Sequence, residues 1–523
     1  MSELRYTEVG YVKSIRGCIV IVEGLHNCIN GQLVEFGLGT FGIIVGFNEK
    51  EAHVLIVKET ISIRTGDEVR ASLEPFTVPV GENFIGRIVN PLCEPFDGLG
   101  PIKEDDYYPI FPSAPPILNR QPLHKTLETG LKVIDAMIPI GLGQRELILG
   151  NKMTGKTTVI TDIILNQKHT DVICIYVATG KARSQLARAV NLFVQNNAFE
   201  YTIVVAAPSS SPAGQQYLSI YVACSLGEYF MQRGKDVFIG FDDFTKHAWC
   251  YREISLLLGR PPGRDSYPGD VFYLHSKMIE RACHFDEERG SGTMTFLPIV
   301  EILEGDLTAF VPSNLVSMTD GQIFLDAQMF GEGQRPALDL GLSVSRVGTK
   351  VQWPIIKDLS GPLRLEYLQF RELKRSSALR AGSQNEETME RLRSGEILTQ
   401  LLRQDKDKPV QMEALVLILF AFREKYFMKL EMEQIIKFQD EIFNFAKDKN
   451  PDLIKTLRER KKMDDEIQQS LTDVIQEFIK TELGEVHEEE PEEDSGDIIS
   501  NIGRDVLEEA TSKKDKTNDK SSS

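Results

Sequence analysis

Residues 150–157 have the types and the spacing of a phosphate-binding loop. They read Gly-Asn-Lys-Met-Thr-Gly-Lys-Thr, which matches the pattern G-x-x-x-x-G-K-T. An apolar run at residues 147–149 precedes them and a helical pattern follows, which is the setting that the motif requires. In such a loop, backbone N–H groups surround the phosphates, Lys156 reaches the β and γ oxygens, and Thr157 offers its hydroxyl to Mg²⁺. The segment therefore predicts binding of a nucleoside triphosphate; a glycine turn that merely ends in Lys-Thr is the weaker alternative.

A second apolar run, residues 237–241, ends in two acids, Asp242 and Asp243. An acid at the end of a strand beside a phosphate loop can hold Mg²⁺ directly or through water. We assign this role to Asp242 and expect Asp243 to support the neighbouring loop; an exposed strand end is the alternative. The predicted metal ligands are thus Thr157 and Asp242. The predicted nucleotide ligands in and after the loop are Gly150, Asn151, Lys152, Met153, Thr154, Gly155, Lys156, Thr157 and Thr158.

The regions around these residues follow different patterns, which predicts a multidomain α/β protein. Residues 1–78 contain short apolar runs between turn signals, which is typical of a small closed β-barrel. In residues 79–361 apolar strands alternate with helices, which indicates a parallel sheet covered by helices. Residues 362–481 have helical periodicity. Within the second region we expect a connector at residues 86–116 and strands at residues 146–149, 172–177, 202–206 and 237–241.

Composition limits the possible partners. The chain has 523 residues, enough for about three domains. Its formal net charge of −18 argues against a nucleic-acid partner, which would need a basic face. The seven cysteines are scattered and form no C-x-x-C pair, which indicates free buried thiols in a reducing cytosol.

The sequence also bears on membranes and on the tail. The first residues lack the apolar stretch of a signal peptide, and the longest apolar run, residues 414–422, is too short to span a bilayer. We therefore expect membrane contact only through other subunits. Residues 482–523 are rich in charged and small polar residues and are predicted to be a disordered acidic tail. Within the tail, residues 498–507 have apolar spacing that could fold on a partner, although a solvated tail is the simpler interpretation.

Longer motifs link the chain to a known family. Residues 139–157, 256–276, 319–325 and 341–348 resemble the alpha subunits of rotary F-type ATP synthases, and the resemblance covers about residues 9–445. It implies a β-barrel, then a RecA-like parallel α/β nucleotide-binding domain, then a C-terminal helical bundle. It also implies ATP and Mg²⁺ as ligands, and beta-type catalytic subunits that alternate with alpha subunits in a three-plus-three ring around a central gamma-type stalk.

The resemblance makes Lys181 the decisive position. A catalytic subunit of the family carries a carboxylate there, which aligns the attacking water, whereas this chain reads Gly180-Lys181. An ammonium cannot accept a proton at neutral pH unless burial strongly lowers its pKa. The family's alpha subunits usually have a neutral amide here, so Lys181 departs from their pattern too. Losing a general base costs about 10² to 10⁴ in rate, so we expect this site to hold Mg-ATP without hydrolysing it.

The resemblance also assigns residues outside the phosphate loop. Arg346 matches the arginine that alpha subunits insert into the catalytic site of the beta subunit, and Ser343 is expected to fix its loop. Without the resemblance, Arg346 would be one surface arginine among many. Arg335-Pro336 matches the Arg-Pro beside the nucleotide. The family's later segment that reaches the base has no recognisable counterpart, and residues 375–383 stand in its place with an apparent insertion, so altered base contacts are expected.

Two further departures concern assembly. The chain starts almost at the barrel, without the helical segment that docks the family's peripheral stalk. Past residue 445 it carries a helical extension, which can pack within the chain or bind a partner. These departures suggest a variant complex that could serve ATP-driven work. The apolar face of the extension comprises Ile467, Leu471, Val474, Ile475 and Phe478.

The leading hypothesis is therefore a non-catalytic, Mg-ATP-binding alpha-type subunit of a rotary ATPase or ATP synthase. It would lend Arg346 to a beta-type neighbour and support ATP-coupled rotation and hydrogen ion transport, peripherally at the cytoplasmic face of a bacterial membrane. One alternative is a self-sufficient homohexameric RecA-like ATPase of the secretion or helicase type. Others are a subunit of a repurposed rotary motor without ion transport, and a ring component that keeps nucleotide only for stability.

Overall fold

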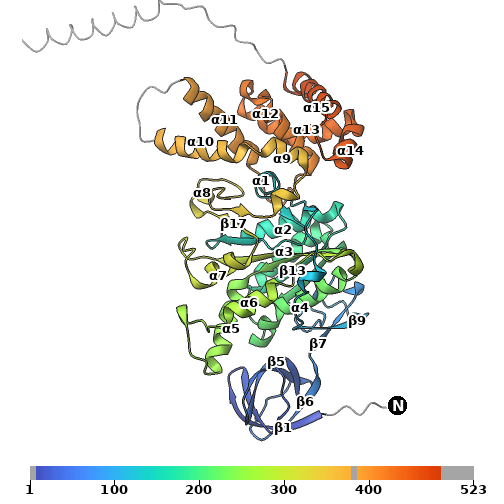
Figure 1. Cartoon of the computed structure of the whole chain (residues 1–523), viewed down its shortest axis with the longest axis vertical. Coiled ribbons are helices and arrows are strands. Elements are labelled where there is room, and N and C mark those ends of the chain that lie inside the picture. The colour runs from blue at the N-terminus through green and yellow to red at the C-terminus, as the bar shows by residue number, and fades with distance from the viewer. Residues whose placement is uncertain (1–6, 378–385, 485–523) are drawn as a thin grey trace, which may run out of the picture. The chain divides into compact units, whose positions relative to one another are not determined.

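The computed structural model describes residues 7–377 and 386–484 of the chain (Figure 1). The predicted acidic tail lies outside these residues except for residues 482–484, as does the segment 498–507. The described residues up to 475 belong to one compact unit, and residues 476–484 belong to a second.

The N-terminal region is a closed β-barrel, as the sequence predicts (Figure 1, blue). Its strands pair in the order β1-β2-β5-β4-β3-β6, and closure leaves no unpaired sheet edge. Alternate side chains point inward and fill the barrel with apolar groups such as Val20, Val34 and Val54, each fully buried. The strands are β1 Thr7–Arg16, β2 Ile19–Glu23, β3 Gln32–Gly37, β4 Thr40–Phe47, β5 Glu51–Lys58 and β6 Glu68–Pro75.

The central region contains an eight-stranded sheet in the order β18-β17-β12-β16-β15-β13-β14-β8. Neighbouring strands are parallel except for β18, which is antiparallel to β17 at one edge. Strands such as β13 and β14 are buried along their whole length, as expected where helices cover both faces. The strands are β8 Ile88–Val89, β12 Leu147–Gly150, β13 Ile173–Thr179, β14 Thr202–Ala207, β15 Asp236–Asp242, β16 Thr293–Glu301, β17 Gly321–Leu325 and β18 Val344–Ser345.

The structure adds elements that the sequence did not indicate. The expected connector at residues 86–116 contributes β8 to the far edge of the sheet and β9, Asp106–Pro109, which pairs with β7, Thr77–Val80. A further pair joins β10, Thr126–Leu127, to β11, Ile140–Gly141. The helices of this region are α1 Lys132–Met137, α2 Lys156–Asn166, α3 Arg183–Gln195, α4 Ala213–Met231, α5 Phe244–Leu257, α6 Val271–Ile279, α7 Phe310–Met318 and α8 Ala327–Gly331.

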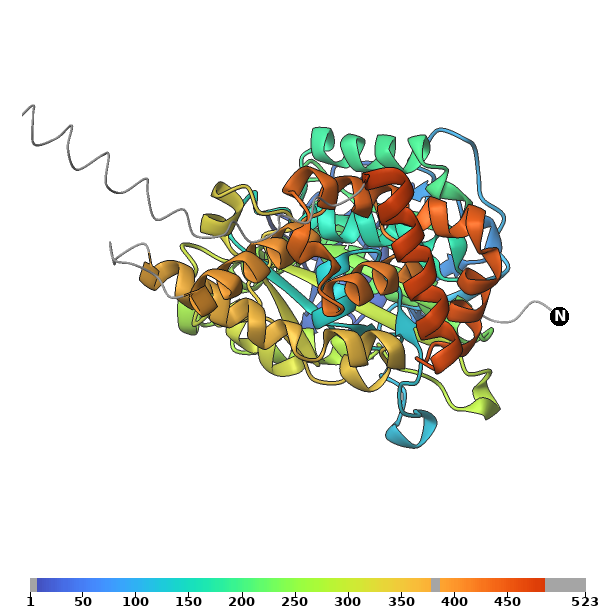
Figure 2. The same ribbon diagram turned by 90° about the horizontal axis from the view of Figure 1, so that it is seen from above.

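Helices make up the C-terminal region, in which α10 and α11 lie side by side (Figure 2). The apolar run at residues 414–422 forms the buried interior of α12. The apolar residues of the extension lie in α15. Ile467, Leu471 and Val474 are buried within this chain, so this face packs inside the chain. The helices are α9 Pro354–Ser360, α10 Leu363–Ser377, α11 Glu386–Leu402, α12 Met412–Arg423, α13 Met432–Lys449, α14 Pro451–Arg460 and α15 Asp465–Phe478, after which Ile479–Leu483 form a π-helical turn.

Two findings qualify the predictions from composition. The seven cysteines are free, as expected, but Cys18 and Cys28 are only partly buried. Across the two described stretches of the chain, every helix is too short or too polar to cross a bilayer.

The barrel and the central region meet at a point where only glycine fits. A Cβ at Gly214, at the start of α4, would lie 2.2 Å from the carbonyl oxygen of Ile56 in β5. A carbonyl within a β-ladder cannot withdraw without breaking the pairing of β5, so the close approach requires the absence of a side chain.

We predict that Gly214→Ala lowers the free energy of unfolding by about 1–3 kcal/mol, the typical cost of an inserted methyl group in a packed interior. Urea or thermal unfolding measures the change. Gly269→Ala is the matched control, because a Cβ there meets no atom within 4 Å. Equal midpoints for the two variants would contradict the close approach.

Candidate functional site

The phosphate loop connects β12 to α2, as the motif predicts. Gly155 has a φ of 97°, in the left-handed region that favours glycine. At Gly150, a Cβ would lie 2.7 Å from Oγ1 of Thr154 and 2.8 Å from the carbonyl oxygen of Leu325. The Thr154 hydroxyl in turn donates to the Asn151 carbonyl at 2.9 Å. The loop is therefore braced from inside, while its outer surface, including Met153, is exposed.

Lys156 lies buried at the base of this loop. Its ammonium donates to the carbonyls of Gly150 at 2.9 Å and Asn151 at 2.5 Å. Burial lowers the pKa of Lys156, an effect that the charges of Glu301 and Asp243 oppose. The side chain thus places a cation beneath the curve of the loop, where phosphate oxygens can replace the carbonyls as acceptors.

The carboxylate of Asp242 contacts side chains from several elements of the site. Its side chain is only 1% exposed. Oδ2 accepts hydrogen bonds from the hydroxyls of Thr157 at 2.7 Å and Tyr176 at 2.9 Å. Oδ1 lies 2.5 Å from the ammonium of Lys181. Three elements of the central region, α2, β13 and β15, and the segment that follows β13 are therefore joined through one side chain.

The oxygens of Thr157 and Asp242 suit Mg²⁺, which takes few protein ligands and keeps phosphate oxygens and waters around it. In the described part of the chain, no three acidic, histidine or cysteine side chains converge into a ready-made metal cage. The site therefore fits an ion that arrives with a nucleotide, and the structure brings together the two predicted metal ligands.

Lys181 follows β13 and Gly180, at the position where the resemblance implied a carboxylate in a catalytic subunit. Burial alone would lower its pKa, but the charges of Asp242 and Asp243 outweigh this effect and raise the pKa of Lys181. The Asp243 carboxylate is 3.6 Å from the ammonium. The side chain therefore stays charged at neutral pH and cannot accept a proton from water.

Asp243 has the supporting position that the sequence suggested. Its side chain accepts the backbone N–H of Lys246 at 2.7 Å and so caps the start of α5. Burial, together with the neighbouring charge of Asp242, raises the pKa of Asp243 to about 6.

Two site residues escaped the sequence reasoning. Tyr176 appeared only as one apolar position of a strand. Glu301 ends β16 and pairs in register with Gly150, the first residue of the phosphate loop. Its charge opposes the lowering of the Lys156 pKa by burial and contributes to the raised pKa of Lys181. The available signal was an apolar run ending in an acid, the same signal that identified Asp242.

Arg346 directly follows the edge strand β18 and is exposed. Its backbone N–H donates to the Asp320 carbonyl at 2.9 Å. Only β17 lies between β18 and β12, which leads into the phosphate loop, but Arg346 is at the other end of the sheet. Ser345 pairs with Gly321, where β17 begins, whereas Gly150 pairs with Leu325, where β17 ends, about 13 Å further along the strand. The guanidinium therefore belongs to the outside of the molecule and does not serve the chain's own phosphate site.

Ser343 braces the segment before Arg346. Its fully buried hydroxyl donates to the Asp339 carbonyl at 2.6 Å and accepts the backbone N–H of Phe324 at 2.9 Å. Arg364 donates to the Ser343 carbonyl at 2.7 Å. Ser343 thus links the segment before Arg346 to Asp339, Phe324 and Arg364.

Arg335-Pro336 lies near the phosphate loop through its neighbour Phe330. The guanidinium of Arg335 stacks 3.5 Å from the centre of the Phe330 ring and donates to the Phe330 carbonyl at 2.6 Å. A Cβ at Gly155 would lie 4.0 Å from that ring. Arg335 and Phe330 thus form one wall beside the phosphate loop.

The expectation of altered base contacts concerns residues 375–383, and those from 378 onward lie outside the described residues. Among the described residues, the loop at residues 404–409 lies beside Arg335, because the backbone N–H of Gln404 donates to the Arg335 carbonyl at 2.8 Å. This loop also contacts the phosphate-loop helix: the N–H of Asp407 donates to Asp162 in α2 at 3.1 Å.

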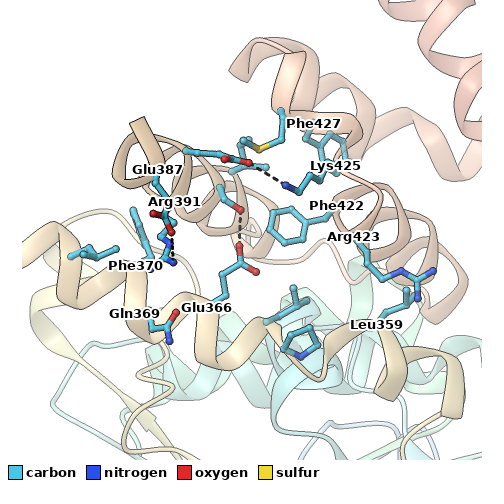
Figure 3. A pocket seen from close by; sticks show the side chains of 17 residues that line it. Leu359, Glu366, Gln369, Phe370, Glu387, Arg391, Phe422, Arg423, Lys425 and Phe427 are labelled. Carbon is cyan, nitrogen blue, oxygen red and sulfur yellow. Dashed lines mark hydrogen bonds and ion pairs between the residues drawn. The ribbon is translucent and has the colours of Figure 1, made fainter. Parts of the chain in front are cut away.

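A separate groove of about 470 Å³ lies in the C-terminal region between α10, α11 and α12 (Figure 3). Its charged side chains contact one another: Glu387 with Arg391 at 2.8 Å, and Glu390 with Lys425 at 3.1 Å. Of the other charged side chains that line the groove, Glu366 accepts the hydroxyl of Ser394 at 2.6 Å and Arg423 pairs with Glu424 at 3.1 Å.

Comparison with known proteins gives a consistent result. Residues 130–345 match the model of the ATP synthase alpha/beta family, nucleotide-binding domain, and residues 352–478 match the ATP synthase alpha/beta chain, C terminal domain. The chain is 43% identical over 484 residues to the ATP synthase subunit alpha of Clostridium botulinum, covering 92% of this chain and 96% of that protein. The corresponding protein of Clostridium acetobutylicum is 44% identical over 92% of this chain and 96% of its own length, and that of Aquifex aeolicus 42% over 91% and 94%.

Asp162 yields a test of the contact between α2 and residues 404–409. Burial raises its pKa to about 7, and the charge of Asp407 adds to this. Because the folded pKa lies above the unfolded value of 3.8, stability falls as pH rises between these values. We predict that Asp162→Asn, which keeps an acceptor for Asp407, removes this loss and stabilises the protein by about 1–3 kcal/mol at pH 8. Urea unfolding of both proteins at pH 5 and pH 8 measures the free energy of unfolding. If this free energy changes between the two pH values as much in Asp162→Asn as in the unchanged protein, the assignment is contradicted.

Proposed function

Because the chain belongs to the ATP synthase alpha/beta family, we propose that it is a nucleotide-binding, non-catalytic alpha-type subunit of a rotary ATPase ring. The observation that carries the proposal is the ion pair of Lys181 with Asp242, 2.5 Å long, at the position where hydrolysis needs a base. The chain keeps the groups that hold phosphates and lacks the one that activates water.

The nucleotide proposed is ATP, held with Mg²⁺. The backbone N–H groups of residues 151–157 surround the phosphates, and Lys156 exchanges its carbonyl partners for phosphate oxygens. Arg335 and Phe330 bound the side on which the base lies. Bound Mg²⁺ supplies positive charge to the phosphate oxygens, and Thr157 and Asp242 are the residues that would hold it.

Hydrolysis requires that a group accept a proton from water. At this site the charged Lys181 repels a proton. Two of its acidic neighbours are engaged: Asp242 by three donors, and Asp243 by Lys181 and the backbone of Lys246. The third acid of the site, Glu301, ends β16 beside Gly150, and its charge acts on both Lys156 and Lys181. Loss of a general base lowers a rate by about 10² to 10⁴. A self-sufficient homohexameric ATPase would need that base, so the alpha-type assignment fits the geometry better.

Arg346 is the proposed contribution to a neighbour. Its exposed position on the edge of the sheet suits insertion into the catalytic site of an adjacent beta-type subunit. A guanidinium there stabilises the charge on the transferring phosphoryl group, an effect worth about 10³ to 10⁵ in turnover. The hydrogen bonds of Ser343 with Asp339, Phe324 and Arg364 hold the segment that presents Arg346.

The proposed partners follow from this role. Three such chains alternate with three beta-type catalytic subunits around a gamma-type central stalk, and the complex couples ATP turnover to rotation, with ATP synthesis and hydrogen ion transport as the associated activities. Membrane contact is through other subunits, at the cytoplasmic face of a bacterial cell membrane. The named relatives are bacterial ATP synthase alpha subunits.

We predict that the purified full chain binds ATP but has no ATPase activity above background. Calorimetric titration and a phosphate-release assay measure the two properties. Lys156→Met should abolish binding, because it removes the cation beneath the loop, while Lys168→Met, an exposed position beyond α2, should leave binding unchanged. Turnover by the isolated chain would overturn the assignment.

We predict that Arg346→Ala lowers the ATPase rate of the assembled ring by about 10³-fold or more, because the transition-state charge loses its cation. ATP binding by the isolated variant should be unchanged, since Arg346 lies far from the chain's own phosphate loop. Lys350→Ala removes an exposed cation four residues further on and serves as the control. Unchanged turnover of the Arg346→Ala ring would favour a purely structural role.

A further inference from the structure

The carboxylate proposed to hold the metal already has a cation of the protein attached to it. Oδ1 of Asp242 is buried and receives no well-aligned hydrogen bond from the described residues, so the ammonium of Lys181 at 2.5 Å is its compensation. Oδ2 faces the hydroxyl of Thr157, the other predicted metal ligand, at 2.7 Å. The ammonium and the metal position therefore share the two oxygens of one carboxylate.

The position of the ammonium is fixed by the backbone that carries it. Gly180 has a φ of 63°, and a Cβ there would lie 2.9 Å from the Lys246 side chain. The Gly180 N–H donates to the Ala207 carbonyl at 2.8 Å, and the Lys181 carbonyl accepts the N–H of Ser209 at 2.9 Å. With its side chain only 17% exposed and anchored by both Asp242 and Asp243, Lys181 is preorganised and needs no rearrangement when a nucleotide binds.

This arrangement changes the charge balance of the site. Lys156 and Lys181 offset two of the three acids of the site, Asp242, Asp243 and Glu301, so that the site repels a polyphosphate less than the acids alone would. A nucleotide without Mg²⁺ is more negative than its magnesium complex. A fixed positive charge near the phosphates therefore favours the free nucleotide relative to the complex.

We propose that Lys181 is a resident cation that takes over part of the role of Mg²⁺, so that this subunit binds ATP nearly as well without the metal as with it. The proposal rests on the proposed nucleotide site and specifies the form of nucleotide that the site accepts. A neutral or acidic side chain at position 181 would leave Asp242 uncompensated and make the metal a requirement.

The test is calorimetric titration of the full chain with ATP, once with excess Mg²⁺ and once in EDTA. The affinities of the unchanged protein in the two buffers should agree within about 10-fold. The glutamine amide of Lys181→Gln can still donate to Asp242, but the variant loses one fixed charge near the phosphates. We therefore compare the ratio of the ATP affinity with Mg²⁺ to the ATP affinity in EDTA. This ratio should be at least about 10-fold higher in Lys181→Gln than in the unchanged protein.

The control is Arg183→Gln, which removes a positive charge two residues from Lys181. The Nε of Arg183 donates to the hydroxyl of Ser210, and its guanidinium does not contact Asp242. This variant should keep the ratio of the unchanged protein. The inference is overturned if the ratio in Lys181→Gln rises less than about 10-fold above that of the unchanged protein. It is also overturned if the ratio rises equally in Arg183→Gln. Should Lys181→Gln fail to fold, the unchanged protein decides: an affinity that falls more than about 10-fold in EDTA contradicts the inference, and a smaller fall supports it. Absence of binding in both buffers would instead refute the proposed nucleotide site.

Discussion

The whole site depends on the burial of one carboxylate. Asp242 can be 1% exposed only because Thr157, Tyr176 and Lys181 each direct a donor at it. Removing one member of such a buried charge pair typically costs about 3–5 kcal/mol, because the remaining charge is left uncompensated. The same contacts tie the phosphate-loop helix to the strands β13 and β15, so stability and ligand chemistry act through the same atoms. What distinguishes this chain from a hydrolysing relative is therefore part of its interior.

The contiguous parts of the site could be predicted from the sequence. The phosphate loop is a local motif whose glycines and lysine are fixed by backbone geometry, and the run ending in Asp242 has the pattern of a buried parallel strand. The barrel followed from short strands with regular turns. In each case neighbouring residues carry the information, and the structure places Lys156, Thr157 and Asp242 together as expected.

Some parts were missed because a local feature argued against them, and others because they depend on contacts between distant segments. Glu301 ends β16, which contains Pro298, and a proline argues against a central strand because it has no N–H for the ladder. The loop at residues 404–409 lies beside Arg335 through backbone hydrogen bonds that leave no pattern in the side-chain sequence. The two-residue strand β8 adds to the sheet from a segment rich in proline and glycine, where a connector was the natural interpretation.

The position of β18 at the edge of the sheet has a consequence for chains that have not yet assembled with a partner. In the role that we propose, Arg346 serves only a neighbouring subunit, and the chain's own phosphate site has an ammonium where a base would be needed, so the chain binds nucleotide without consuming it. In that role, copies made in excess of their partners would leave the nucleotide pool untouched. Turnover would then begin only once two different polypeptides have assembled.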